Sequence, residues 1–137
     1  MARKTGIKVT KQRHDWDCGI AALAMLLDKP YGDVVMLARE LIDQKKLKRR
    51  GTIIADLHII ADSFGTALQL IYRKVGYLEG QTGILGMIGG EMDKAGHWVV
   101  LKEGKVVIDP DDASVWGVQD YLKRHGCRST VLLVKCK

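Results

Sequence analysis

The sequence lacks the cysteine patterns that define disulfide-rich domains and zinc sites. Its three cysteines, Cys18, Cys127 and Cys136, are odd in number and widely separated, so they suggest no closed disulfide framework. There is no CxxC pair and no Cys/His array with zinc-ligand spacing. These absences exclude a disulfide scaffold and predict a protein that works in a reducing compartment, the cytoplasm.

The sequence also lacks a long apolar run and a secretory signal. No apolar stretch approaches the ~18 residues that a membrane-spanning helix needs. The polar N-terminus contains no hydrophobic region of the kind found in signal peptides. With 137 residues, of which 47% are hydrophobic and 28% charged, the composition is that of an ordinary globular protein. We therefore expect one soluble domain over residues 1–137.

Positive charge is in excess, and the formal net charge is +6. Much of this excess lies in two clusters, residues 2–11 and the run 45–50. Such clusters attract phosphate backbones or acidic partners. Most charged runs, however, are simply solvated surface, and we favour that interpretation here. Nucleic-acid binding thus stays an alternative that charge alone does not favour.

Hydrophobic periodicity predicts helices in the first half of the chain. Residues 18–27 are almost wholly apolar and rich in helix formers, which is typical of a helix buried on most sides, with Asp17 as its N-cap. Further helices are expected from residue 31 or 33 to about 45 and from 53 to 64. Gly51 and Thr52 would form the loop and the N-cap between them. The alternation of Ile7 and Val9 with polar residues indicates a short strand or an extended arm.

Strand-like segments fill most of the second half. We expect strands at residues 67–72, 83–88, 98–101, 106–108 and 130–134, and a short helix at 118–124. Gly104 is typical of a hairpin turn between the third and fourth of these strands. Because the helices come first and the strands afterwards, the sequence predicts an α+β fold with helices packed on one side of a largely antiparallel sheet.

Cys18 is the strongest candidate for a nucleophile. A thiol attacks efficiently only as thiolate, and the N-terminus of a helix favours that form. Cys18 opens the predicted apolar helix. For any single cysteine, a buried structural role is an equally good interpretation. We interpret Cys127 and Cys136, which have no evident partners, as structural.

His97 and Asp109 are candidates for a base and the residue that orients it. His97 precedes the strand 98–101, and Asp109 follows the strand 106–108. The hairpin brings both residues to the same end of two paired strands, where the carboxylate can accept from one imidazole nitrogen and leave the other for the thiol. Taken singly, His97 would be a satisfied core residue and Asp109 a turn former.

Gln12 completes the set as a candidate oxyanion donor. It lies six residues before Cys18, and a loop of that length can fold back towards the thiol. The Gln12 amide and the backbone N–H of Cys18 would then hold a developing oxyanion together. Without Cys18, an exposed glutamine in a basic loop would be the simpler interpretation.

These four residues lie in segments that resemble one enzyme family. Residues 12–26, QRHDWDCGIAALAML, resemble the start of the bacteriocin-processing, double-glycine-leader peptidases, which belong to the papain-like cysteine proteases. Residues 96–101, GHWVVL, and 107–110, VIDP, resemble the His and Asp segments of the same family. The resemblance covers about residues 7–135. Well-studied members are N-terminal domains of membrane exporters, whereas this chain has neither spans nor an ATPase, which indicates a free-standing relative.

The resemblance implies a papain-like fold and a cysteine peptidase acting on a peptide or protein. By this likeness Cys18 is the nucleophile, His97 the general base and then acid, Asp109 the orienting residue and Gln12 the oxyanion donor. The reaction would pass through an acyl-enzyme at Cys18, and no metal or cofactor is needed.

Two alternatives to a peptidase remain open at this point. The first is a non-catalytic binding or effector module on the same fold, which would grip a protein or a nucleic acid through the basic patches. It gives no reason for Cys18, His97, Asp109 and Gln12 to occur together. The second, lesser alternative is an acyl transferase that delivers the acyl group to an amine in place of water. Oligomeric state is left open.

Overall fold

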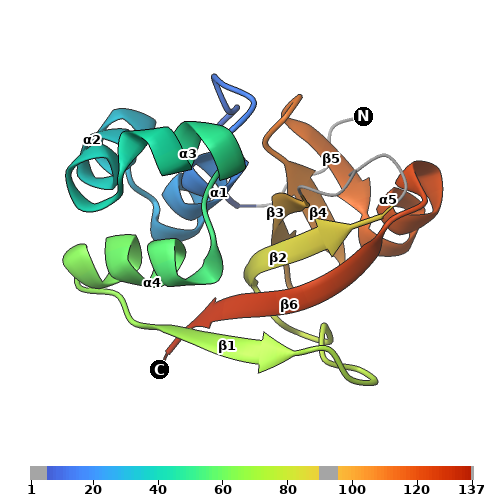
Figure 1. Cartoon of the computed structure of the whole chain (residues 1–137). Helices are drawn as coiled ribbons and strands as arrows, with labels where there is room; N and C mark the ends of the chain where they lie inside the picture. Colours follow the sequence, from blue (N-terminus) through green and yellow to red (C-terminus); the bar gives the residue numbers. More distant parts are fainter. Residues whose placement is uncertain (1–5, 90–95, 137) are drawn as a thin grey trace.

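The computed structural model describes residues 6–89 and 96–136 and shows five helices and a six-stranded sheet among them (Figure 1). Residues 2–5 of the first basic cluster lie outside the described part of the chain. The helices are α1 (Cys18–Leu27), α2 (Tyr31–Leu41), α3 (Gln44–Arg50), α4 (Ile54–Ser63) and α5 (Val118–His125).

The predicted first helix is confirmed, and it is buried almost completely. In α1 every residue after Cys18 is buried, as expected for a helix with apolar residues on all sides. Asp28 adopts a left-handed conformation at its C-terminus, with φ 55° and ψ 49°, and Pro30 follows two residues later. The backbone N–H of Asp28 points back to the carbonyls of Ala24 and Met25, which ends the helix.

The second helix is shorter than predicted, and the basic run forms a helix of its own. α2 ends at Leu41 because Ile42 is extended, with φ −123° and ψ 138°. The carboxylate of Asp43 then accepts hydrogen bonds from the backbone N–H groups of Lys45 and Lys46. This N-cap starts α3. Periodicity alone did not reveal the break, because both segments are helical.

Thr52 is not the N-cap predicted for the helix that follows. α4 begins at Ile54, and the N-cap position is Ile53, whose backbone N–H donates to the carboxylate of Asp56 at 3.0 Å. The side chain of Thr52 is buried instead, and its Oγ1 has no hydrogen-bond partner among the described residues.

The sheet is antiparallel throughout, with strand order β1-β6-β2-β3-β4-β5. Its strands are β1 (Leu68–Tyr72), β2 (Gly83–Ile88), β3 (His97–Lys102), β4 (Val106–Asp109), β5 (Ser114–Gly117) and β6 (Arg128–Lys135). The hairpin between β3 and β4 turns at Glu103 and Gly104, which both have positive φ, as tight hairpin turns require. The α+β fold and the antiparallel sheet predicted from the sequence are confirmed.

The structure adds one strand, β5, and it excludes the strand from the two alternatives for residues 7–9, a short strand or an extended arm. β5 was not predicted, because it is a short edge strand whose residues are all half-buried and therefore do not alternate. Conversely, residues 7–9 form no strand. They run as an extended arm, and the backbone N–H of Gln12 donates to the carbonyl of Pro110 at 2.7 Å. The arm is thereby fixed to the end of β4.

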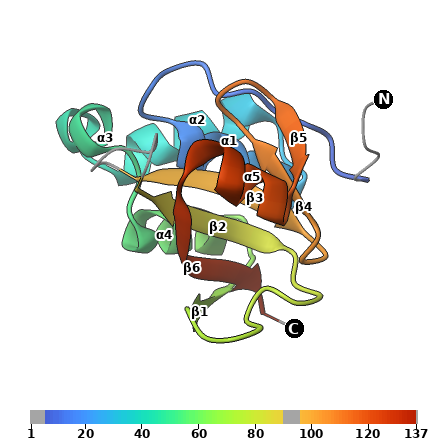
Figure 2. The same ribbon diagram turned by 90° about the vertical axis from the view of Figure 1, so that its right-hand side faces the viewer.

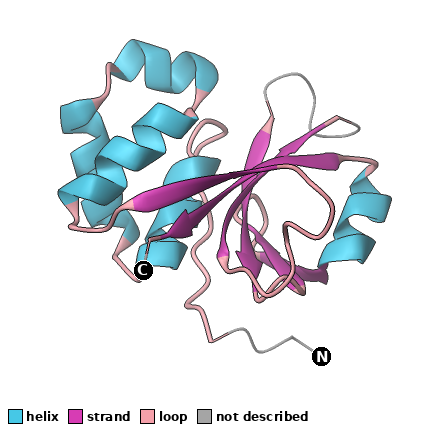
Figure 3. Cartoon of the chain, turned by 90° about the horizontal axis from the view of Figure 1, so that it is seen from below, coloured by secondary structure: helices cyan, strands magenta, loops and turns pink. Residues whose placement is uncertain are grey.

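The sheet separates two apolar clusters. Helices α1 to α4 gather on one side (Figure 1), where their side chains pack against Ile84, Val100, Ile108 and Leu133. Contrary to the prediction that the helices pack on one side, α5 lies on the opposite face over β4 and β5, where it joins an apolar cluster that includes Leu85 and Val99 (Figures 2 and 3). Strand neighbours point to opposite faces, which explains why each strand serves both clusters.

No helix in the described ranges, 6–89 and 96–136, combines the length and the apolar character that crossing a bilayer requires.

Candidate active site

Cys18 is the first residue of α1, and its side chain is only partly buried. The first backbone N–H groups of a helix have no partner within the helix, and they carry a partial positive charge. The next residue, Gly19, is buried against Thr52 and Trp98. The sequence expectation that a thiol opens a buried helix therefore holds in the structure.

Asp17 occupies the N-cap position of α1 but makes no capping bond, contrary to expectation. Its carboxylate turns back and accepts from the backbone N–H groups of Arg13, at 3.4 Å, and His14, at 3.1 Å. It also accepts a hydrogen bond from the hydroxyl of Tyr31. Asp17 is fully buried. Its role is therefore to hold the loop before Cys18 in shape.

The hairpin brings His97 and Asp109 together, as predicted. His97 Nε2 lies 2.6 Å from Oδ1 of Asp109, and the two side chains are 13% and 7% exposed. The backbone N–H of Asp111 also donates to Oδ1 of Asp109, at 2.9 Å. A carboxylate held in this way fixes the orientation of the imidazole ring.

The imidazole of His97 bridges Asp109 and the thiol of Cys18. Burial of the ring opposes its charged form, but hydrogen bonds to Asp109 and Cys18, together with their negative charges, raise the pKa of His97 from 6.5 to about 10. Because Asp109 occupies Nε2, Nδ1 is the nitrogen left for the thiol. A protonated imidazole beside a thiol favours the nucleophilic thiolate.

Tyr121 holds the second oxygen of Asp109. Its hydroxyl donates to Oδ2 at 2.7 Å, and its side chain is fully buried on α5. Burial by itself would raise the pKa of Asp109, but the bond from His97 and its positive charge, with help from Asp111 and Tyr121, hold that pKa below its usual value. Asp109 is therefore charged at neutral pH and bound through both oxygens.

Gln12 lies close to His97 and Asp109, and all three line a cavity of about 260 Å³. Its Nε2 donates to the backbone carbonyl of His14 at 2.7 Å, and its Oε1 is buried without a hydrogen-bond partner among the described residues. An amide nitrogen carries two hydrogens, so one donor remains for a ligand. Gln12 thus shares a cavity with the His97 imidazole, and one of its two amide hydrogens is used by the bond to His14.

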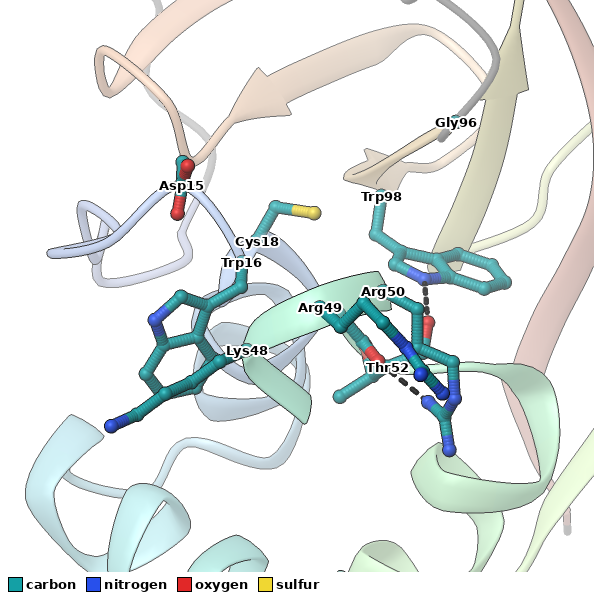
Figure 4. Close-up of a pocket in the computed structure, with 10 residues that line it drawn as sticks. Asp15, Trp16, Cys18, Lys48, Arg49, Arg50, Thr52, Gly96 and Trp98 are labelled. Carbon is teal, nitrogen blue, oxygen red and sulfur yellow. Dashed lines mark hydrogen bonds between the residues drawn. The ribbon is translucent and has the colours of Figure 1, made fainter. Parts of the chain in front are cut away.

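Trp98 lines two cavities, one of which is also lined by Cys18 and the other by His97. Its indole N–H donates to the carbonyl of Thr52 at 3.0 Å, which anchors the ring. One cavity, of about 190 Å³, is lined by Cys18 and Trp98 and by the end of α3 (Figure 4). The other, of about 330 Å³, lies along β2 and β3 and is lined by His97 and Trp98. One cavity therefore lies beside the thiol and the other beside the imidazole.

Three residues of this site were not found from the sequence: Asp17 as a loop brace, Tyr121 and Thr52. A tyrosine on the apolar face of a predicted helix carries no signal that its hydroxyl meets a carboxylate. Likewise, the sequence does not distinguish a buried threonine in a loop from an exposed one. No group of three or more His, Cys, Asp or Glu residues with metal-binding geometry occurs within residues 6–89 and 96–136.

The cysteines carry no disulfide. Cys127 is half-buried, but Cys136 is exposed, so the expectation of a structural role for Cys136 finds no support in its packing.

Three of the solved structures similar to this chain are a protease and peptidase domains from transporters. A double-glycine-motif protease from an AMS/PCAT transporter, solved with its leader peptide, superposes with a TM-score of 0.69 over 98% of this chain and 94% of its own, at 19% identity. The peptidase domain of Streptococcus ComA, a bifunctional ABC transporter, gives a TM-score of 0.68 over 94% and 97%, at 16% identity. The Streptococcus mutans ComA domain bound to an inhibitor gives 0.64 over 95% and 99%, also at 16% identity.

At these identities, the structural likeness establishes the fold. Comparison with curated protein sequences gives no significant match. The sequence model of one family, in contrast, matches the chain from residue 6 to residue 136. That range includes α1, the hairpin and α5, and hence every residue of the site described above. The chain therefore belongs to the peptidase C39 family of cysteine peptidases.

Proposed function

We propose that this protein hydrolyses a peptide bond through an acyl-enzyme at Cys18, with His97 and Asp109 completing a triad and Gln12 donating to the oxyanion. The observation that carries the proposal is the chain of contacts from Asp109 through His97 to Cys18. Residues 1–137 would form a single peptidase domain. The substrate is a peptide or protein, in keeping with the leader peptide bound by one of the similar proteases.

In the first half of the reaction, the Cys18 sulfur attacks the carbonyl carbon, and the carbonyl oxygen becomes an oxyanion. The backbone N–H of Cys18, unpaired because it opens α1, and the remaining N–H of Gln12 donate to this oxyanion. As the C–N bond breaks, protonated His97 delivers its Nδ1 proton to the leaving amine. A thioester on Cys18 and a free amine result.

In the second half, water attacks the thioester. His97, now neutral, takes a proton from the water at Nδ1, the C–S bond breaks, and the acid product and the Cys18 thiolate form. Asp109 stays charged and stabilises the imidazolium each time it appears. Three cysteines without a disulfide are compatible with this chemistry in a reducing compartment, for which we propose the cytoplasm.

The test is cleavage of a complex peptide library derived from a proteome digest, with new termini identified by mass spectrometry. The wild type and Cys136→Ser should generate the same new termini, and Cys18→Ala and His97→Ala should generate none. Cleavage by Cys18→Ala would rule out the proposed nucleophile. In ¹⁸O-labelled water, hydrolysis puts the label into the new carboxyl group. Acyl transfer would instead join the acyl fragment to an amine without label.

Thiol labelling gives a second test that needs no substrate. Cys136 is exposed and Cys18 is partly buried. Accessibility alone thus predicts that iodoacetamide modifies Cys136 first. A thiolate stabilised by His97 predicts the reverse order, and His97→Ala should remove the advantage of Cys18. Slower modification of Cys18 than of Cys136 in the wild type would contradict an activated nucleophile.

A further inference from the structure

The cavity beside Cys18 is bordered by the C-terminal turn of α3, the helix formed by the basic run. Lys48, Arg49 and Arg50 all line this cavity together with Cys18. The helix is held against the protein by Leu47, which is 1% exposed. The basic run is therefore neither a tail nor a distant surface patch. Its last three residues line the same cavity as Cys18.

Two of these three cations are not neutralised within the described residues. Arg50 forms a 2.8 Å ion pair with Asp56 and also donates to the carbonyl of Gly51. Lys48 and Arg49 are exposed, and no carboxylate of residues 6–89 or 96–136 forms an ion pair with either of them. Figure 4 draws the Lys48 side chain extending past Trp16, away from Cys18, but both side chains are exposed and can turn towards a ligand that enters the cavity.

Of the remaining polar side chains that line the cavity, Thr52 favours a carboxylate ligand and Asp15 opposes it. Thr52, which also lines it, is buried, and its hydroxyl has no hydrogen-bond partner among the described residues. A hydroxyl in this position can donate to an anion. Asp15 is the acidic residue of the lining, and Figure 4 draws it across Cys18 from Arg49. Lys48 and Arg49 outnumber it.

We propose that Lys48 and Arg49 form a carboxylate-binding subsite beside Cys18, which selects peptide substrates with Glu or Asp within one or two residues of the scissile bond. This inference rests on the proposed peptidase function and names its substrate class. The short range follows from the shared cavity, since each residue of an extended chain advances about 3.3 Å. A partly desolvated cleft concentrates the field of such cations.

The subsite can be tested without a known substrate by comparing two alkylating reagents of nearly equal size. Iodoacetate carries a carboxylate and iodoacetamide does not, so the ratio of their rates at Cys18 reports attraction of an anion to the thiol. Any change in the fraction of thiolate affects both reagents and cancels in the ratio. The charge reversal Lys48→Glu/Arg49→Glu should lower the ratio by about three- to tenfold at low salt.

The matched control is Lys45→Glu/Lys46→Glu. It makes the same charge change in the same helix, at exposed positions that do not line the cavity, and it should leave the ratio within about twofold of the wild type. The ratio at exposed Cys136 is an internal reference in each sample. An unchanged ratio at Cys18 in Lys48→Glu/Arg49→Glu, or an equal fall in both variants, would overturn the subsite.

Peptide cleavage then links the subsite to specificity. In pairs of cleaved library peptides that differ by Glu against Gln next to the scissile bond, the wild type should show a higher kcat/KM for Glu. The preference should vanish in Lys48→Glu/Arg49→Glu and weaken from about 0.05 M to about 0.5 M NaCl. Equal cleavage of both peptides by the wild type refutes the subsite and leaves the peptidase intact. No cleavage of any peptide, with Cys18 unreactive, refutes the proposed function itself.

Discussion

The hydroxyl of Tyr121 donates a 2.7 Å hydrogen bond to Oδ2 of Asp109, the carboxylate whose other oxygen binds His97. Tyr121 lies on α5, on the face of the sheet opposite α1, and it is fully buried. The orientation of the imidazole therefore depends on packing from both sides of the sheet. We interpret Tyr121 as a positioning residue, because it reaches the thiol only through Asp109 and His97.

Tyr121→Phe should lower kcat by about three- to 100-fold and leave KM nearly unchanged, because small displacements of a reacting group are costly whereas Tyr121 lines none of the cavities around the thiol. It should also destabilise the protein by about 1–3 kcal/mol, since an oxygen of a buried carboxylate loses its donor. Steady-state kinetics and urea unfolding measure these two effects.

Tyr77→Phe is the matched control. Tyr77 is also buried, and its hydroxyl bonds Ser129 and not a residue of the Cys18–His97–Asp109 set. This variant should lose comparable stability and keep its kcat. If both variants lose kcat in proportion to stability, Tyr121 has only a structural role.

The pKa of His97 predicts how stability depends on pH. Because the folded pKa, about 10, lies above the ordinary value of 6.5, the imidazolium contributes stability that is complete below pH 6.5. That contribution is lost as pH rises from 6.5 to about 10. Asp109→Asn removes a charge that raises this pKa, so the variant should lose less stability than the wild type over this pH range. Urea unfolding at a series of pH values measures the difference between wild type and variant.

An NMR titration of the His97 ring supplies the direct check. In the wild type the midpoint should lie near 10, and in Asp109→Asn it should move down. A wild-type midpoint near 6.5 would show that Asp109 and Cys18 do not stabilise the charged ring.

Gly19→Ala should lower the free energy of unfolding of the protein by about 1–3 kcal/mol, because an added methyl group overpacks a tightly packed core. A Cβ on Gly19 would lie 1.9 Å from Oγ1 of Thr52 and 3.0 Å from the Trp98 ring, so Thr52 and Trp98 must both move. Gly32→Ala in α2 is the control, because its Cβ would meet nothing within 4 Å. It should be neutral or stabilise by up to about 1 kcal/mol. Urea unfolding of both variants distinguishes crowding from helix propensity.

Asp17→Ala should destabilise the protein by about 1–3 kcal/mol, because the N–H groups of Arg13 and His14 and the hydroxyl of Tyr31 lose their acceptor. Asp15→Ala, two residues earlier and exposed, should change stability by less than about 0.5 kcal/mol. Thermal unfolding provides the comparison. Equal effects of the two substitutions would show that Asp17 does not brace the loop.

The local pattern of the sequence predicted α1 and the β3–β4 hairpin well. An unbroken apolar segment such as residues 18–27 has no exposed face to misassign, and a glycine between two strand-like segments is typical of a hairpin turn. Errors arose where two helical segments adjoin. The break at Ile42 depends on a side-chain cap by Asp43, which periodicity does not register. β5 was missed because an edge strand is only half-buried, so its residues do not alternate.

The sequence by itself determined that a thiol opens a buried helix and that a histidine and an aspartate share one end of a hairpin, since both follow from interactions between near neighbours in the chain. Only the tertiary structure decided that Tyr121 binds Asp109, that Gln12 shares a cavity with His97, and that Lys48 and Arg49 border a cavity with the thiol. Those contacts join segments from different elements. Burial against the sheet brings them together, and no local periodicity encodes which partner a buried hydroxyl or an exposed cation will meet.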